Sequence, residues 1–295
     1  MNINRNITQL IGNTPLIEAS NLIDKKEVKL LLKLESQNPG GSVKDRPAFN
    51  MINQALKRGD IKRGSHLVEA TSGNTGIALA LTAKLLNLNI TLVMPESATL
   101  ERIKTMKAYG AEVVLTDSQK GIEYSRDVAL EIHKNKGAYM LNQFENEDNW
   151  KAHYKTTGPE IWKGTNGEIT HFVSAMGTTG TITGVSTYLK EKNKNIQVIG
   201  AQPKAGSKIP GIRKWSPEYI PSIFKPENID NILEVSQEEA TKMTRKLALK
   251  EGVFAGMSSG GAVYSALQIA EQITKGTIVT IICDKGDRYL SSNLF

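Results

Sequence analysis

One lysine and four loops rich in glycine, serine or threonine carry the residues of this sequence that could do chemistry. Lys44 lies in PGGSVKDR (39–46), and the other loops are TSGNTG (71–76), GTTGT (177–181) and GMSSGG (256–261). A lysine in a crowded loop beside a helix N-terminus can have a lowered pKa, and its neutral amine can form a Schiff base with an aldehyde. Most lysines are solvated, so Lys44 alone predicts no function.

The residues around Lys44 also match an ordinary helix start. Ser42 and Asp45 fit an S-x-x-D capping box, which predicts a helix beginning at Val43 with Lys44 in its first turn. A cation at that position opposes the helix dipole, and this unfavourable placement calls for an explanation. A functional amine supplies one, whereas a capped helix start accounts for Ser42 and Asp45 without any chemistry.

The loop GTTGT has the residues of a phosphate cradle. Its glycines let the backbone approach a ligand, and a helix N-terminus offers free N–H groups to an anion. Neither a GxGxxG nor a GxxxxGK[ST] loop is present, so a phosphate site here would be of another type. A plain strand-to-helix turn with threonine caps would have the same composition.

The two remaining loops offer polar groups of other kinds. TSGNTG combines backbone N–H groups with three hydroxyls and one amide, which could bind a carboxylate, although a capped helix start is the commoner case. In GMSSGG, Ser258 or Ser259 could cap a helix, or a serine hydroxyl could point at a ring nitrogen. A lysine, a phosphate cradle, a carboxylate loop and a ring-nitrogen partner together describe a site for pyridoxal phosphate (PLP) and an amino-acid substrate.

Strands and helices alternate along the chain, which predicts an α/β fold of parallel sheets flanked by helices. The 295 residues exceed what one core usually organises, so two domains or one large α/β unit are expected. The special loops follow predicted strands, where ligands bind in such sheets. Strands are expected at 66–70, 90–95, 113–116, 138–141, 171–176, 197–202 and 277–283, and helices at 77–88, 100–110, 121–137, 182–193 and 238–252.

The composition argues against several classes of protein. The net charge is +7, but the basic residues are interleaved with acidic ones, so no nucleic-acid partner is expected. No apolar run reaches the roughly 20 residues of a membrane-spanning helix, and the N-terminus lacks the layout of a secretory signal. The lone Cys283 excludes an internal disulfide and fits a cytoplasmic protein. The four histidines lack metal-ligand spacing, so no metal site is expected and all four are interpreted as structural.

The four loops and the segments around them occur in the same order, over nearly the whole chain, as in a known family. The sequence resembles the fold-type II PLP enzymes, specifically the cysteine synthases (O-acetylserine sulfhydrylases). Two further stretches, 206–224 and 281–291, are most similar to the type B branch of that family, whose members also accept thiosulfate. The segments that carry the resemblance are IGNTPL (11–16), NPGGSVKDR (38–46), EATSGNTGIALA (69–80), GPEIW (158–162), SAMGTTGTITGVS (174–186) and SSGGAV (258–263).

The resemblance implies two domains like those of the tryptophan synthase β subunit, each a mainly parallel twisted sheet flanked by helices. Residues 36–147 would form the smaller domain, with a mobile part that closes over the substrate. Residues 1–35 and 148–295 would form the larger domain, which carries the phosphate loop.

The resemblance also implies a role for each loop. Lys44 would form the aldimine with PLP and act as the general base. Asn74 would contact the ring hydroxyl and Ser258 the pyridine nitrogen. The phosphate would lie on Gly177, Thr178, Thr179, Gly180 and Thr181, and the substrate carboxylate on Thr71, Ser72, Thr75 and Gln143. Arg213 would lie near an incoming anion, with the adjacent Lys214 as the alternative.

The implied reaction is β-replacement on O-acetyl-L-serine by sulfide or thiosulfate. It gives L-cysteine or S-sulfocysteine plus acetate through an aminoacrylate intermediate, in an enzyme whose relatives are homodimers. Other reactions at the same site stay open: cystathionine or lanthionine synthesis, O-phosphoserine as the donor, and H₂S release from cysteine. A non-catalytic binding module with this fold is the alternative from another class.

Overall fold

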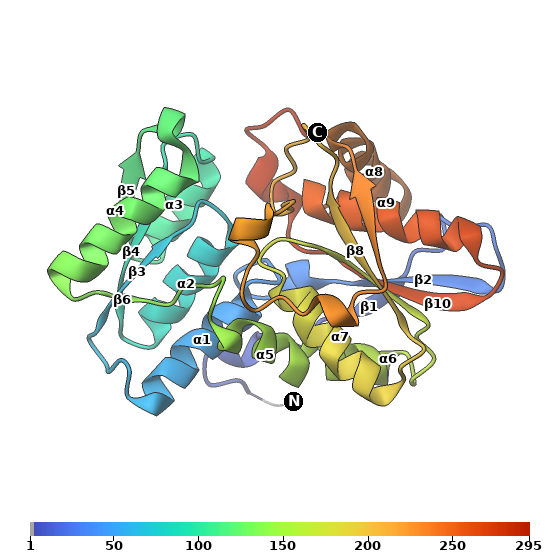
Figure 1. Ribbon diagram of the computed structural model, residues 1–295, viewed down its shortest axis with the longest axis horizontal. Coiled ribbons are helices and arrows are strands. Elements are labelled where there is room, and N and C mark those ends of the chain that lie inside the picture. Colours follow the sequence, from blue (N-terminus) through green and yellow to red (C-terminus); the bar gives the residue numbers. More distant parts are fainter. Residues whose placement is uncertain (1–2) are drawn as a thin grey trace.

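Two β-sheets, each covered by helices on both faces, make up the protein (Figure 1). The computed structural model describes residues 3–295. The smaller sheet has the strand order β5-β4-β3-β6, and all its strands run parallel. These strands are β3 (His66–Ala70), β4 (Asn89–Pro95), β5 (Glu112–Thr116) and β6 (Tyr139–Met140).

The larger sheet has the strand order β1-β2-β10-β7-β8-β9. β1 pairs antiparallel with β2, and the other neighbouring strands run parallel. Its strands are β1 (Leu16–Glu18), β2 (Val28–Lys33), β7 (His171–Ala175), β8 (Gln197–Pro203), β9 (Asn231–Val235) and β10 (Gly276–Ile281). The predicted α/β fold with two mainly parallel sheets is confirmed.

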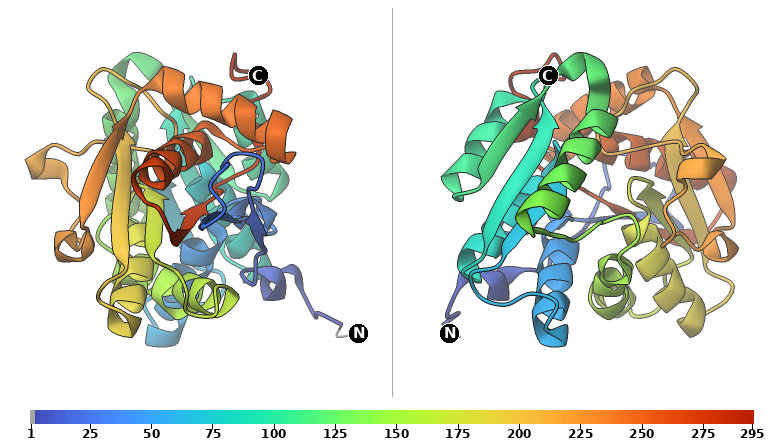
Figure 2. Two further views of the ribbon diagram at one scale, coloured as in Figure 1. Left: turned by 90° about the vertical axis from the view of Figure 1, so that its right-hand side faces the viewer. Right: turned by 60° about the vertical axis from the view of Figure 1, so that its left-hand side comes forward.

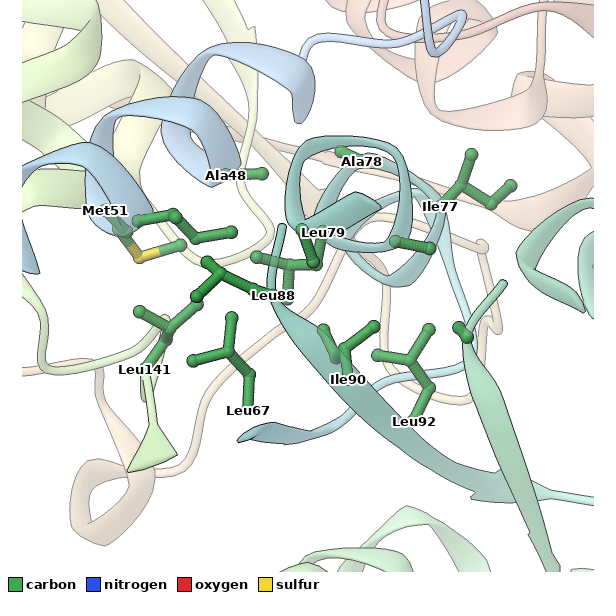
Figure 3. Close-up of a cluster of buried hydrophobic side chains, with 14 of the residues drawn as sticks. Ala48, Met51, Leu67, Ile77, Ala78, Leu79, Leu88, Ile90, Leu92 and Leu141 are labelled. Atoms are coloured by element: carbon green, nitrogen blue, oxygen red, sulfur yellow. The ribbon is translucent and has the colours of Figure 1, made fainter. Parts of the chain in front are cut away.

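Helices on both faces explain why the central strands of the smaller sheet are apolar along their length. α1 (Asp45–Arg58), α2 (Asn74–Leu85) and α3 (Leu100–Ala108) cover one face, and α4 (Gly121–Lys136) crosses the other (Figure 2). On the first face, Leu67, Ile90 and Leu92 of the strands pack against Met51 and Leu79 of the helices (Figure 3).

The larger sheet is covered in the same way. α8 (Gln237–Glu251) and α9 (Met257–Gln272) pack on one face, and α6 (Thr157–Gly164) and α7 (Gly180–Lys192) on the other. The parallel register aligns Val198, Phe172 and Val279 across three strands, and these side chains belong to the core beneath α7. α5 (Glu147–Lys155) lies between α1 and α7 and so connects the two units.

The predicted elements occur within about three residues of their expected bounds, and several short elements were missed. β1, β2, β9, α5 and α6 were not predicted. The segment that forms α5 and α6 has Gly158 and Pro159 inside it, which obscures its helical period. None of the helices within residues 3–295 is long and apolar enough to cross a membrane.

Candidate active site

A cavity of about 1210 Å³ opens where strands of both sheets end at their carboxyl edges. The structure brings almost all the predicted site residues to its wall: Lys44, Thr71, Ser72, Asn74, Thr75, Gln143, Gly177, Thr178, Thr179, Thr181, Arg213 and Ser258. Gly180 is the exception. It lies behind the wall, where a Cβ would stand 2.1 Å from Asn149 Oδ1.

The helix that follows Lys44 begins later than predicted. α1 starts at Asp45, so Lys44 is its N-cap residue rather than part of the first turn. The predicted capping box is also wrong, because its two side chains have other partners. Ser42 Oγ accepts from the Lys44 N–H at 3.2 Å, and the Asp45 carboxylate accepts from the Gly40 N–H. These bonds hold the glycine-rich loop against the helix start and direct Lys44 into the cavity.

A buried ion network anchors the same helix start. Arg46 Nε donates to Glu35 at 2.7 Å, and Arg46 Nη2 donates to Glu160 at 2.7 Å. Lys33 Nζ donates to the same Glu160 carboxylate at 2.6 Å. Burial opposes ionisation of Glu160, but Arg46 and Lys33 outweigh it and hold the pKa of Glu160 at about 2. Because breaking such a network leaves buried charges unpaired, the position of the neighbouring Lys44 is strongly constrained.

The Lys44 amine is suited to nucleophilic and base chemistry. Burial lowers its pKa, although the neighbouring acidic groups Cys283, Asp284 and Glu35 act in the opposite direction. Its ε-amine pairs with no carboxylate in the part of the chain that the structure describes. The lowered pKa expected from the sequence is therefore present. Its main cause is burial.

The turn before α7 presents hydroxyl groups to the cavity. Thr179 is the N-cap residue and has a left-handed backbone, with φ of +68°, which is strained for a β-branched residue. Its buried hydroxyl has no hydrogen-bond partner among residues 3–295. Unpaired buried hydroxyls are costly, so this donor, at the positive end of a helix, suits an anionic ligand.

The loop before α2 is joined to Gln143. Thr75 Oγ1 donates to Gln143 Oε1 at 2.8 Å, and both residues are buried. The Thr75 hydroxyl fixes Oε1 as the acceptor end of the amide, and the two N–H groups of Gln143 remain available as donors. Gln143 thereby adds donors to the hydroxyls of Thr71 and Ser72 in the same cavity wall.

Asn74 has partners that sequence reasoning missed. Its Nδ2 donates to Asp284 Oδ2 at 2.7 Å, and its Oδ1 accepts from Arg288 Nη1. Arg288 also donates to the Gly40 carbonyl, in the loop before Lys44. The only signal in the sequence was the similarity of 281–291 to the type B enzymes, which named no pairing. Together these bonds fix which end of the Asn74 amide is the donor.

Ser258 lies in the first turn of α9 and is almost completely buried. The N-cap residue is Gly256, so the prediction that Ser258 or Ser259 caps this helix is wrong. Ser259 Oγ instead accepts from the Cys283 N–H at 2.9 Å. Cys283 also lines the cavity, and burial raises the pKa of its thiol to about 11, so the thiol form predominates.

Aromatic and basic side chains form the mouth of the cavity. The Arg213 guanidinium lies over the Trp215 ring at 5.4 Å, and Trp215 Nε1 donates to the Gly177 carbonyl at 2.9 Å. Lys214 forms an ion pair with Glu234 at 2.5 Å. Of the two adjacent cations, Arg213 is therefore the one without a carboxylate partner within the described residues.

The donor set matches the functional groups of PLP. An amine with a lowered pKa suits an aldehyde, and an unpaired hydroxyl at a helix N-terminus suits a phosphate. No group of three or more histidine, cysteine, aspartate or glutamate side chains that could hold a metal ion occurs within residues 3–295.

Comparison with known proteins identifies the family. The model of the family described as "Pyridoxal-phosphate dependent enzyme" matches residues 7–284. Cysteine synthase B of Pseudomonas aeruginosa is 50% identical over 98% of this chain and 97% of the relative. Cysteine synthase B of Escherichia coli is 51% identical over 98% of this chain and 95% of the relative.

A solved structure supports the same assignment. The cysteine synthase of Entamoeba histolytica is 40% identical and superposes with a TM-score of 0.94, covering 100% of this chain and 91% of that one. The predicted cofactor and enzyme class are confirmed. The chain belongs to the family of pyridoxal-phosphate dependent enzymes and, within it, to the cysteine synthases of type B.

Proposed function

We propose that this enzyme replaces the acetyl ester of O-acetyl-L-serine with sulfur. Sulfide would form a carbon–sulfur bond at the β-carbon to give L-cysteine, and thiosulfate would give S-sulfocysteine. In both cases the β-carbon–oxygen bond breaks and acetate leaves with its electron pair. The observation that carries the proposal is the free Lys44 amine facing an unpaired hydroxyl turn across one cavity.

The residues that would hold PLP are Lys44, Asn74, Ser258 and the turn 177–181. When bound, PLP supplies an electron-withdrawing ring that stabilises negative charge at the substrate α-carbon. Ser258, a neutral hydroxyl, would meet the ring nitrogen without holding it protonated as a carboxylate does. Asn74 would offer its remaining N–H to the ring hydroxyl, because Arg288 and Asp284 fix its amide.

Lys44 would move the proton. Its lowered pKa leaves a larger neutral fraction at physiological pH, and Nζ can then accept the α-proton as acetate departs. After sulfur has added, the protonated amine returns that proton to the α-carbon. The nearby Asp284 and Glu35 limit the lowering of the pKa, which keeps the protonated form accessible for this second step.

Thr71, Ser72, Thr75 and Gln143 would bind the substrate carboxylate. The hydroxyls of Thr71 and Ser72 and the Gln143 amide lie on the smaller-sheet side of the cavity. Thr75 would bind through its backbone N–H, because its hydroxyl donates to Gln143. We propose that residues 36–147 act as the smaller domain and move toward residues 1–35 and 148–295 when the carboxylate binds. Such closure would exclude water from the reacting β-carbon.

Arg213 would attract the anionic sulfur donor at the mouth of the cavity. A planar guanidinium suits the sulfonate end of thiosulfate better than it suits sulfide. Lys214 is a weaker candidate for this role, because Glu234 already pairs with it.

Steady-state assays of the purified holoenzyme with O-acetyl-L-serine test the proposal. Acetate release and product analysis are measured with sulfide, thiosulfate, homocysteine and cysteine in turn, and with O-phosphoserine as the other acyl donor. Release of acetate with formation of cysteine and S-sulfocysteine is expected. Turnover with homocysteine or cysteine alone would assign the enzyme to cystathionine or lanthionine synthesis, and no turnover with any donor would favour a binding module.

We also propose that the enzyme works in the cytoplasm as a homodimer. The lone Cys283 supports this location, and the resemblance to the cysteine synthases implies this assembly. Light scattering on the full-length chain should give twice the mass of one chain, and a mass of 32.3 kDa would reject the dimer.

A further inference from the structure

Two buried side chains of α5 lie directly behind the turn 177–181. Asn149 and His153 are four residues apart and so share one face of the helix. Both side chains are almost completely inaccessible to solvent. Sequence reasoning assigned no role to Asn149 and interpreted His153 as structural.

Close packing of α5 on α7 brings these side chains to the turn. A Cβ on Gly180 would stand 2.1 Å from Asn149 Oδ1. One turn further along α7, a Cβ on Gly184 would stand 2.7 Å from His153 Cβ and 2.2 Å from the Trp150 carbonyl oxygen. A larger residue at Gly184 would separate the helices, and one at Gly180 would displace the Asn149 side chain, so the two glycines set how closely α5 meets the turn.

Asn149 supplies an N–H to the first hydroxyl of the turn. Its Nδ2 donates to Thr178 Oγ1 at 3.3 Å and to the Gln143 carbonyl at 2.6 Å. Thr178 Oγ1 also accepts from the Gly180 N–H at 3.4 Å. Because this oxygen accepts two hydrogen bonds from the protein, the hydroxyl proton of Thr178 remains available to a ligand in the cavity.

His153 contacts the last hydroxyl of the turn. Its Nε2 lies 3.3 Å from Thr181 Oγ1, and its Nδ1 lies 2.9 Å from Thr157 Oγ1. Burial lowers the pKa of His153 well below its usual value, the charges of Arg46 and Lys44 add to that effect, and Glu160 opposes it. The ring is therefore neutral, with one N–H and one acceptor nitrogen.

The two tautomers of a neutral His153 have opposite consequences. With the proton on Nδ1, Nε2 would accept the Thr181 hydroxyl proton and leave that threonine with no proton for a phosphate. With the proton on Nε2, the ring donates to Thr181 Oγ1, and Nδ1 accepts from the Thr157 hydroxyl. Only the second arrangement leaves Thr181 free to donate to an anion.

We propose that Asn149 and His153 are positioning residues for the cofactor phosphate: they donate N–H groups to Thr178 and Thr181, so that both threonine hydroxyls direct their protons to the phosphate. The inference rests on the proposed role of the turn 177–181 as the phosphate cradle. It predicts a specific tautomer of His153, with the proton on Nε2. It also predicts that His153→Gln keeps the PLP affinity of wild type, because the side-chain N–H of glutamine can reach the same position.

Cofactor binding to the full-length chain, freed of its cofactor, tests the inference. The dissociation constants of PLP and of pyridoxal, which lacks the phosphate, are measured for wild type, Asn149→Leu, His153→Leu and His153→Gln. PLP should bind about tenfold more weakly to each leucine variant. The threonine that has lost its N–H donor would no longer hold its hydroxyl proton toward the charged phosphate, so one charge-assisted hydrogen bond would be lost. Pyridoxal binding should stay within about twofold, and His153→Gln should behave as wild type.

Tyr154→Phe is the matched control. Tyr154 lies on the same helix and its hydroxyl donates to Glu191 of α7, away from the turn, at 2.8 Å. Its PLP affinity should equal that of wild type. Equal losses for PLP and pyridoxal in the leucine variants, or a loss in Tyr154→Phe as large as theirs, would show that the helix pair acts only through general stability and would overturn the inference.

Nitrogen NMR of His153 in the PLP-bound wild type tests the tautomer without any substitution, so the inference stays open to refutation even where a leucine variant fails to fold. A proton on Nε2 is expected, and a proton on Nδ1 would overturn the inference. Failure of the wild type to bind PLP would instead contradict the proposed function, which keeps the two outcomes distinct.

Discussion

Two helix N-termini face the same cavity, and they are held in different ways. The turn before α7 has Thr179 in a left-handed conformation, and α5 packs directly behind it. The turn before α2 has an extended N-cap residue, Gly73, with φ of −123°. Its Asn74 is held by Asp284 and Arg288, which come from the far end of the chain.

The difference separates a fixed side of the site from an adjustable one. The α7 turn is braced by α5, which packs against α7 at backbone contact distance. The α2 turn depends on hydrogen bonds that cross from the smaller sheet to the C-terminal segment. A cofactor that stays bound suits the first arrangement, and a substrate that enters and leaves at each turnover suits the second.

Lys44→Ala should give the largest effect on activity, because Lys44 would act on both the cofactor and the substrate. We expect kcat for β-replacement to fall by a factor of about 10² to 10⁴, the usual value of a general base. The α7 turn should still bind PLP, without a covalent bond. Assays of acetate release and of cofactor retention after gel filtration measure the two effects, with the exposed Lys57→Ala as control. Complete loss of PLP from Lys44→Ala would contradict an independently formed phosphate side.

The ionisation of Glu69 tests the adjustable side of the site through the pH dependence of the free energy of unfolding. Burial raises its pKa from 4.5 to about 7, while the Asn142 N–H and Arg126 act in the opposite direction. The folded state therefore holds this proton more tightly than the unfolded state. The resulting stabilisation is fully present below pH 4.5 and is lost as the pH rises through about 7.

Glu69→Gln should remove that pH dependence, which is on the order of 3 kcal/mol if the whole shift is expressed. Glutamine can still accept the Asn142 N–H, so the bond at 3.1 Å that supports the segment before Gln143 is kept. Urea unfolding at pH 5, 6, 7 and 8 measures the effect. The variant should become more stable than wild type as the pH rises, and parallel curves for the two proteins would contradict the raised pKa.

A pair of glycine substitutions compares the two turns directly. Gly180→Ala places a Cβ 2.1 Å from Asn149 Oδ1, and displacement of that side chain should cost about 1–3 kcal/mol of stability and weaken PLP binding. Gly73→Ala meets no atom within 4 Å among residues 3–295, and its backbone conformation is open to alanine. It should retain PLP fully. Urea unfolding and PLP titration measure both variants, and equal behaviour would remove the distinction between the turns.

Much of this site could be predicted because the relevant loops are local in sequence. Gly177, Thr178 and Thr179 follow a strand and start a helix, and both elements are visible in the hydrophobic pattern. Lys44 was found in the same way, from a loop next to a helix start. The exact start of that helix was missed by two residues, because Ser42 and Asp45 bond to nearby backbone N–H groups instead of capping.

The contacts that position these loops could not be predicted from one sequence. Asn149 and His153 lie on α5, which was missed, and they read as ordinary polar residues until α7 is seen to pack against them. The partner of Asn74 is Arg288, more than two hundred residues away. Such pairings arise from the relative placement of two sheets, on which hydrophobic periodicity carries no information.

Arg288→Lys should give the smallest effect and the sharpest test of the comparison. Lysine keeps the positive charge but lacks the planar fork that reaches Asn74 Oδ1 and the Gly40 carbonyl together. Loss of about one net hydrogen bond, or roughly 1 kcal/mol, should raise KM for O-acetyl-L-serine about fivefold. PLP affinity should fall by less than KM rises, because Arg288 does not contact the α7 turn and would act on the cofactor only through the Asn74 amide.

Arg245→Lys is the matched control for Arg288→Lys. Arg245 also holds the C-terminal segment, through the Leu294 carbonyl at 2.8 Å, but it does not contact Asn74. It should leave KM unchanged, because general ordering of the C-terminal segment is not what orients the Asn74 amide. An equal rise of KM in both variants would assign the effect to that ordering. A loss of PLP affinity in Arg288→Lys at constant KM would mean that the C-terminal segment supports the cofactor, and the division between a fixed and an adjustable side would then be wrong.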